Sequence, residues 1–352
     1  MKFSKFISLF ICFSLLASAS LSCAPTEGPK EPKTQANSYY EYFDTVCTVI
    51  SYAGDSADTF SANCDAISAL LREYHRLFDI YYEYADVNNL RTVNKNAASA
   101  PVKVDRKLID FLLYAKEIHG LTNGATNIAM GSVLKLWHDA REDGIDDPEN
   151  AYLPSSEELF EAAKHTNIDD LIIDEKENTV FFADPLMRLD VGAIGKGYAA
   201  ERAAELLIER GVTSYVLNIG GNIRTIGSKP SGEGWTTGIT NPDKSSEDEF
   251  VCKVIIKDTS LVTSGDYERF YEVDGVRYHH IIDPQTNMPA AYFSSISVFT
   301  KDSGLADALS TALFCMSYED GLALVKKLGE VDVIWVSPDG NVKMTDGITL
   351  YN

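Results

Sequence analysis

The feature that most constrains this chain is a glycine-rich segment, LDVGAIGKGY, at residues 189–198. One turn holds three glycines, Asp190 and Lys196, and a helical pattern of apolar positions follows from Ala199 to Glu209. Backbone N–H groups at a helix N-terminus can bind a phosphate, and Lys196 supplies a cation. The spacing is neither the Walker nor the Rossmann pattern. The residues alone therefore leave two interpretations open, an anion site and a plain structural turn.

Four later segments also concentrate polar and reactive side chains beside apolar, strand-like runs. They are Asn218–Ile223 (NIGGNI), Thr263–Glu268 (TSGDYE), His279–Pro284 (HHIIDP) and Ala306–Thr311 (ADALST). Together with the turn, they resemble the ApbE family of FAD:protein FMN transferases, flavin-handling enzymes that use magnesium. The resemblance also takes in Tyr42–Thr45, Thr122–Gly131 and Leu136–Trp137. It covers nearly everything after residue 38.

The N-terminus has the pattern of a secretory leader. Lys2 and Lys5 precede an uncharged apolar run from Phe6 to Leu21. That run is too short and too close to the N-terminus to favour a spanning helix, so residues 1–22 are predicted to be a signal peptide. Cys23 follows a small residue, as in bacterial lipoproteins, and is the expected lipid attachment site. A retained membrane anchor is the alternative.

Residues 23–38 carry the expected lipidated cysteine and a disordered tether rich in Pro, Lys, Glu, Thr and Gln. Residues 39–352 are then the catalytic domain. The formal net charge of −21 argues against nucleic acid or an anionic lipid surface as a partner. We therefore expect an extracytoplasmic protein of the bacterial cell envelope that touches the membrane only through Cys23.

Of the six cysteines, four lie in the body: Cys47, Cys64, Cys252 and Cys315. None has metal-ligand spacing, which argues against structural zinc. Buried free thiols are the expected state, with disulfides left open.

The predicted fold class is α+β, with mixed sheets and flanking helices. The resemblance implies an ApbE-like (T-fold-like) architecture with a helical N-terminal lobe, in one domain or two lobes. The expected helices are 60–74, 108–119, 157–164, 199–209, 305–314 and 318–328. The expected strands are 43–52, 170–173, 179–182, 214–219, 235–239, 251–256 and 294–299, with an acidic surface loop at 143–154.

Asp307, Ser310 and Thr311 are spaced i, i+3, i+4, which places three oxygen-bearing side chains on one face at the start of a helix. Such oxygens suit Mg²⁺. An aspartate cap with hydroxyls facing solvent explains the pattern equally well. The resemblance implies that these residues bind the metal, Mg²⁺ or Mn²⁺, together with the backbone carbonyl of Ala193.

His279 and His280 should point to opposite faces of a strand, so only one can face a site. The resemblance selects His280, whose imidazole suits proton transfer near neutral pH. A structural histidine is the alternative. Asp283 is a secondary catalytic candidate that could also simply start the turn before Pro284.

The resemblance implies a flavin-nucleotide site built from several segments. Its predicted contacts are Phe43, Tyr81, Ala125, Thr126, Asn127, Asp190, Lys196, Ser264, Gly265 and Ile281. Two departures from the family pattern weaken the resemblance at this predicted site. Gly124–Asn127 lacks an aromatic residue and a charge, and Asp44 stands where glycine is common.

The expected reaction is Mg²⁺-dependent transfer of FMN from FAD to a Thr or Ser hydroxyl of an acceptor flavoprotein, with release of AMP. His280 would accept the hydroxyl proton, and Lys196 would balance charge. Expected acceptors belong to an extracytoplasmic electron-transfer system. The alternatives are an FAD pyrophosphatase that uses the same site, a non-enzymatic FAD-binding lipoprotein and, less favoured, a solute-binding lipoprotein.

Overall fold

The computed structural model describes residues 33–351, which belong to one compact unit. The predicted signal peptide and Cys23 lie outside the described residues. The helices are α1 (Ala57–Phe78), α2 (Leu90–Asn96), α3 (Arg106–Leu121), α4 (Gly131–Asp146), α5 (Ser156–Ala163), α6 (Gly195–Glu209), α7 (Ser303–Phe314) and α8 (Tyr318–Leu328). The strands are β1 (Gln35–Tyr42), β2 (Thr45–Ser51), β3 (Val102–Lys103), β4 (Leu171–Asp174), β5 (Thr179–Phe182), β6 (Ser214–Ile219), β7 (Asn222–Gly227), β8 (Trp235–Thr240), β9 (Phe250–Ile256), β10 (Ser260–Gly265), β11 (Phe270–Val273), β12 (Val276–His279), β13 (Ser295–Thr300), β14 (Asp332–Val336) and β15 (Val342–Met344).

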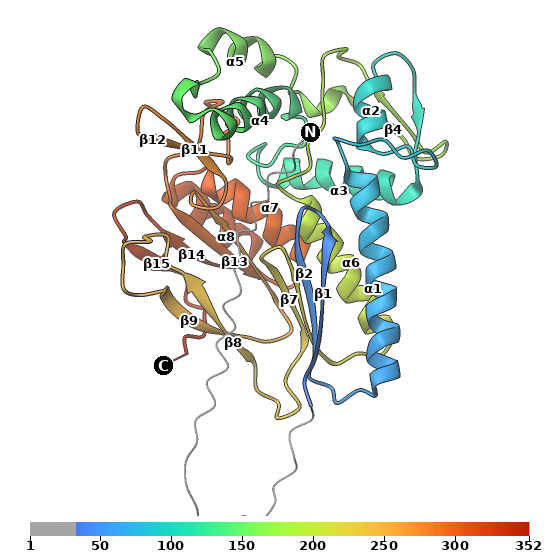
Figure 1. The fold of residues 1–352 in the computed structure, drawn as a ribbon, viewed down its shortest axis with the longest axis vertical. Helices are drawn as coiled ribbons and strands as arrows, with labels where there is room; N and C mark the ends of the chain where they lie inside the picture. The colour runs from blue at the N-terminus through green and yellow to red at the C-terminus, as the bar shows by residue number, and fades with distance from the viewer. Residues whose placement is uncertain (1–32, 352) are drawn as a thin grey trace, which may run out of the picture. The chain divides into compact units, whose positions relative to one another are not determined.

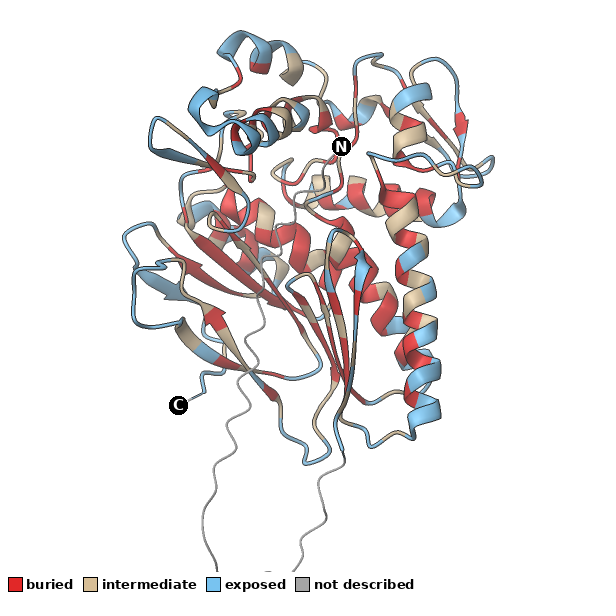
Figure 2. Cartoon of the chain, in the orientation of Figure 1, coloured by how far each residue is buried: buried red, intermediate tan, exposed pale blue. Residues whose placement is uncertain are grey.

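An eight-stranded antiparallel sheet organises the fold, with strand order β1-β2-β6-β7-β10-β13-β14-β15. Along β6 the side chains alternate between its faces. Tyr215, Leu217 and Ile219 join the apolar cluster beneath the helices, while Val216 joins the cluster on the opposite face. Both faces of the central strands are therefore covered, as the burial pattern in Figure 2 shows.

Three helices, α1, α6 and α7, cover one face of this sheet (Figure 1). The two-stranded ribbon β8–β9 covers part of the other, with Trp235, Ile239 and Val254 packed against the sheet. The helices α4 and α5 and the hairpin β11–β12 share a further apolar cluster around Trp137 and Tyr271. The elements from the first half of the chain thus join the same unit as the last strands.

The α+β class is confirmed, and most predicted elements are found within a few residues of their expected ends. The folded part begins before residue 39, the expected start of the domain, because Gln35–Ser38 already pair with β2. The loop predicted at 143–154 begins later than expected, since α4 runs to Asp146. Sequence patterns missed the helices α2 and α4 and the strands β1, β3, β7, β10, β11, β14 and β15.

The four body cysteines are all free thiols, and three of them are buried. Among the residues that the structure describes, no helix is long and apolar enough to cross a membrane.

The helices α6 and α7 approach each other unusually closely at Gly197. A Cβ built on Gly197 would lie 2.3 Å from the carbonyl oxygen of Ser303 and 2.4 Å from the Cβ of Asp307. Real Cβ atoms do not come this near to backbone, so only glycine fits without moving one helix. Glycine at position 197 is therefore required by packing.

Replacement of Gly197 by Ala is expected to lower the free energy of unfolding by about 1–3 kcal/mol, because the added methyl overpacks the helix contact. Alanine nevertheless favours a helix more than glycine does. Gly120 is the matched control, since it lies in α3 and a Cβ added there would meet nothing within 4 Å. Urea unfolding should show Gly120→Ala unchanged or stabilised, and equal stability of both variants would contradict this account.

Candidate active site

The glycine-rich turn enters α6 without a side-chain cap, because Ile194 is the N-cap residue. Asp190 stabilises the turn: its Oδ1 accepts a hydrogen bond from the Gly192 N–H at 2.9 Å. The Asp190 N–H donates to the carbonyl of Ile128 at 2.8 Å. Burial raises the pKa of the Asp190 carboxyl, while the Gly192 amide and nearby cations oppose that shift. Asp190 therefore shapes the turn, whatever else it binds.

The N–H of Gly197 donates to Oδ2 of Asp307 at 2.7 Å. Gly197 is the third residue of α6, so its N–H is one of the first-turn donors that have no acceptor within the helix itself. The Ala193 carbonyl, just before the helix, receives no hydrogen bond from the described residues. The contact therefore orients Asp307, and the Ala193 oxygen is free.

Asp307 lies in the second turn of α7, buried to 5 % exposure. The helix is capped by Asp302, whose side chain accepts from the Leu305 N–H, so Asp307 is not the cap. Burial raises the pKa of Asp307, and the charge of Lys196 and the Gly197 amide pull it back down. No ion pair to Asp307 forms in the part of the chain described here. A buried carboxylate without an ion-pair partner favours a bound cation.

The neighbouring oxygens divide into two roles. The Ser310 hydroxyl donates to the Asp307 carbonyl at 2.8 Å and lies 2.7 Å from the Ser264 hydroxyl. The Thr311 hydroxyl is partly exposed and makes no hydrogen bond to any described residue. The Asn222 side chain lies beside Asp307 and lowers the pKa of that carboxyl, although its buried Nδ2 makes no hydrogen bond of normal geometry to residues 33–351.

These donors fit a hard divalent cation. Asp307, the Ala193 carbonyl and Thr311 offer free oxygens, with Ser310 and Ser264 as hydrogen-bonded support. Mg²⁺ prefers oxygen ligands and keeps several waters, so few protein ligands suffice. No group of three or more His, Cys, Asp or Glu residues suited to a metal occurs among the described residues.

The two histidines have different environments, as predicted. His279 ends β12, and its Nε2 lies 2.8 Å from the carbonyl of Ala290, with its ring edge-on to Phe314. His280 lies just beyond the strand, and its buried Nδ1 has no partner among the described residues. Burial first, and then the cation Arg269, lower the pKa of His280 to about 3. His280 is therefore a neutral imidazole at pH 7.

Asp283 starts a turn, which is the alternative role that the sequence analysis gave for it. Its Oδ1 accepts from the Gln285 N–H at 2.8 Å, and its backbone N–H donates to the carbonyl of Met288. It makes no hydrogen bond to either histidine within residues 33–351. The structure thus gives no support to a catalytic role for Asp283.

Several residues beside the site were missed from the sequence: His138, Arg141, Glu268 and Arg269. Desolvation raises the pKa of Asp190, and raises that of the half-exposed Tyr81 to about 12, while the charges of Arg141 and Arg269 oppose both shifts. The ring of Tyr81 lies 5.4 Å from His138. Glu268 is exposed at the surface, yet local desolvation raises its pKa against the charges of Lys196 and Arg269. Two of the four gave a sequence signal, because Glu268 ends the TSGDYE segment and Arg269 follows it directly.

The loop before α4 supports α7 instead of offering its side chains to a ligand. The Thr126 hydroxyl donates to the carbonyl of Ala308 at 2.7 Å, and the residue is 2 % exposed. The Asn127 side chain donates to the carbonyl of Thr166 and accepts from the Ala129 N–H. Both side chains are therefore engaged within the protein, while Ala125 is partly exposed beside them. The flavin contacts of these three residues stay a prediction.

The other predicted flavin-contact residues lie in different local environments. Phe43 adopts a left-handed backbone conformation, with φ 55°, and packs edge-on to His75. The Ile281 side chain is buried in the cluster beneath α7. Gly265 ends β10 under the ring of Tyr267. Phe43 and Ile281 therefore present mainly packing surfaces.

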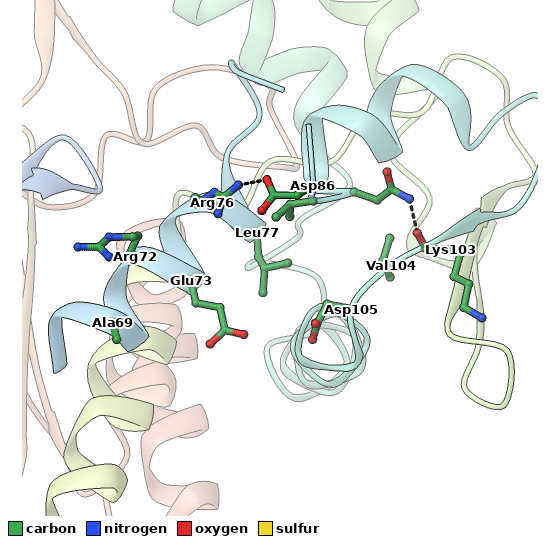
Figure 3. Close-up of a pocket in the computed structure, with 11 residues that line it drawn as sticks. Ala69, Arg72, Glu73, Arg76, Leu77, Asp86, Lys103, Val104 and Asp105 are labelled. Carbon is green, nitrogen blue, oxygen red and sulfur yellow. Dashed lines mark hydrogen bonds and ion pairs between the residues drawn. The ribbon is translucent and has the colours of Figure 1, made fainter. Parts of the chain in front are cut away.

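A separate cavity of about 550 Å³ lies between α1 and the segments 86–88 and 103–105. Figure 3 shows Arg76 paired with Asp86, and the Asn88 amide donating to the carbonyl of Lys103. Glu73 is paired with Lys107. None of the predicted site residues lines this cavity, so the candidate active site is the one around Asp307.

A sequence profile of the ApbE family matches residues 43–335, which is most of the chain. The chain belongs to the ApbE family. A relative from Treponema pallidum, an FAD:protein FMN transferase, is 35% identical over 318 residues, covering 86% of this chain and 85% of its own. A Vibrio cholerae relative with the same name is 32% identical over 81% of this chain and 80% of its own.

Solved ApbE structures have the same fold. The ApbE protein of Thermotoga maritima superposes with a TM-score of 0.77 at 28% identity, covering 89% of this chain and 97% of its own. The flavin transferase ApbE of Vibrio cholerae gives a TM-score of 0.73 at 27% identity, covering 89% and 96%. The predicted ApbE-like architecture is therefore confirmed.

Stability should depend on His280 in a defined pH window. Its pKa is 6.5 in the unfolded chain and about 3 when folded. Between these values the unfolded state binds more protons, so the free energy of unfolding falls as pH drops from 6.5 toward 3. In metal-free protein, His280→Gln should flatten this slope by at most about 1.4 kcal/mol per pH unit. Urea unfolding of the wild type and of His280→Gln from pH 7 to 4 measures this slope. Parallel stability profiles for the two proteins would contradict a neutral His280 in the folded state.

Proposed function

We propose that this protein transfers FMN from FAD to a hydroxyl group of an acceptor flavoprotein, with release of AMP. The names of its relatives support the activity, since they are FAD:protein FMN transferases. The structural observation that carries it is the contact between the Gly197 N–H and Asp307. That contact would hold the buried Asp307 carboxylate at the turn that carries Lys196 and the Ala193 carbonyl.

Mg²⁺ is the cation that we assign to this site, held by Asp307, Thr311 and the Ala193 carbonyl, with Mn²⁺ as the substitute. When bound, the ion would polarise the FAD diphosphate and offset the charge of the departing AMP. The fit rests on the free oxygens described above and on the raised pKa of Asp307. Ser310 and Ser264 would hold α7 and β10 together behind the ligands.

The protein's own groups would carry the remaining chemistry. Lys196 and the turn amides would bind the phosphates and stabilise charge that develops on them. The acceptor hydroxyl oxygen would form a bond to the FMN phosphorus, the bond from phosphorus to the AMP oxygen would break, and His280 would take the hydroxyl proton. In the empty site His280 is a weak base, but the negative diphosphate would raise its pKa. The neutral imidazole is the form that can accept a proton.

The acceptor is proposed to be a flavoprotein of an extracytoplasmic electron-transfer system. This location rests on the leader-like residues 1–22 and on Cys23 as a lipid attachment site. The acidic surface implied by the net charge of −21 would keep such an enzyme off anionic headgroups.

The decisive test mixes residues 33–352 with FAD, Mg²⁺ and a candidate acceptor domain. AMP release and acceptor mass are followed with and without EDTA. Asp307→Ala should slow transfer at least about 100-fold, because the ion supplies several kcal/mol of charge stabilisation and about 1.4 kcal/mol is worth tenfold in rate. The control Asp339→Ala, in an exposed turn, should keep full activity.

The products separate the proposal from its alternatives. An acceptor that gains one FMN only when metal is present supports the transferase. Release of AMP and free FMN without an adduct would instead indicate an FAD pyrophosphatase. Tight FAD binding without turnover, against several acceptors, would indicate a flavin-binding lipoprotein.

A further inference from the structure

A second contact joins α6 to α7 one helical turn away from the first. The Ser303 N–H, in the first turn of α7, donates to Oε2 of Glu201 at 2.8 Å. Gly197 and Glu201 are four residues apart on α6, and Ser303 and Asp307 are four apart on α7. The helices therefore run antiparallel here, and each donates an early N–H to a carboxylate of the other (Figure 1).

The strand β7 contributes one residue to each contact. Asn222 lies beside Asp307, and Arg224 donates from Nε to Oε2 of Glu201 at 3.0 Å. Residues two apart on a strand share a face, and their spacing nearly equals one helical turn. Two junctions result, each made of one residue from α6, one from α7 and one from β7. The first junction is Gly197, Asp307 and Asn222; the second junction is Glu201, Ser303 and Arg224.

The second junction is deeply buried. The side chains of Arg224 and Glu201 are 1% and 8% exposed, and Ser303 is fully buried. Arg224 also donates to the carbonyl of Thr225. A single oxygen of Glu201, Oε2, accepts from both Ser303 and Arg224. Because a buried carboxylate with several directional bonds tolerates little displacement, this junction fixes how α7 lies along α6.

We propose that Glu201 is a positioning residue, which sets the placement of α7 so that Asp307 and Thr311 meet the Ala193 carbonyl around one divalent cation. The inference rests on the proposed function, because it takes that cation to be bound there. Glu201 itself touches neither the ion nor the substrate. Outer residues that orient metal ligands typically change metal affinity by about 10–100-fold when replaced.

The test is a Mg²⁺ titration of residues 33–352 by isothermal calorimetry, with folding checked by circular dichroism. Glu201→Met removes all three hydrogen bonds that Glu201 accepts, two from Arg224 and one from Ser303, at similar side-chain size and should weaken Mg²⁺ binding about tenfold. Glu201→Gln retains an acceptor oxygen and should weaken it less. Glu205→Gln, also on α6 but exposed, is the matched control and should bind as the wild type does. FAD binding in EDTA should be unchanged in all three.

Normal Mg²⁺ affinity in both Glu201 variants, even with a lowered melting temperature, would overturn the proposal and leave Glu201 as a purely structural residue. If Glu201→Met does not fold, the comparison of Glu201→Gln with Glu205→Gln decides, and equal affinities would overturn it. Asp307→Ala should abolish the binding heat, and retention of that heat would place the ion elsewhere and overturn the inference too. A wild type that binds Mg²⁺ through Asp307 but transfers no FMN would refute the proposed function alone.

Discussion

The rest of the site depends on one hydrogen bond, from the Gly197 N–H to the Asp307 carboxylate. It requires that α6 and α7 lie so close together that a methyl group added to Gly197 would not fit between them. That approach gives a first-turn backbone donor of α6 a carboxylate partner on α7. One glycine therefore serves both the packing of the two helices and the orientation of Asp307. The structural interpretation of the glycine-rich segment is confirmed, and its use as an anion site stays a prediction.

Local patterns predicted most of the fold because its helices are amphipathic and several strands are bounded by clear turns. The strands β10 and β14 escaped notice because they are buried on both faces and show no alternation. At the site, motif residues such as Lys196, His280 and Asp307 could be selected in advance. The engagement of Thr126 and Asn127 could not, because their partners, Ala308 and Thr166, are 182 and 39 residues away in sequence.

Charge explains why this site needs its cations. The chain carries a net charge of −21, so an anionic nucleotide approaches against an unfavourable field. Lys196, Arg141 and Arg269 bring positive charge to the site, and after burial their charges lower the pKa of His280. The partly buried Asp190 and the buried Asp307 add negative charge to the same region. The result is a site of mixed charge in which a divalent ion would complete the balance.

The buried hydroxyl of Thr126 has a consequence for self-modification. Thr126 is of the residue type that the proposed reaction would modify. Its hydroxyl donates to the Ala308 carbonyl, and the residue is buried. Folding would thereby keep this threonine from accepting FMN at the protein's own site. By the same logic, an acceptor of the proposed reaction would have to present a threonine or serine whose hydroxyl is free and exposed.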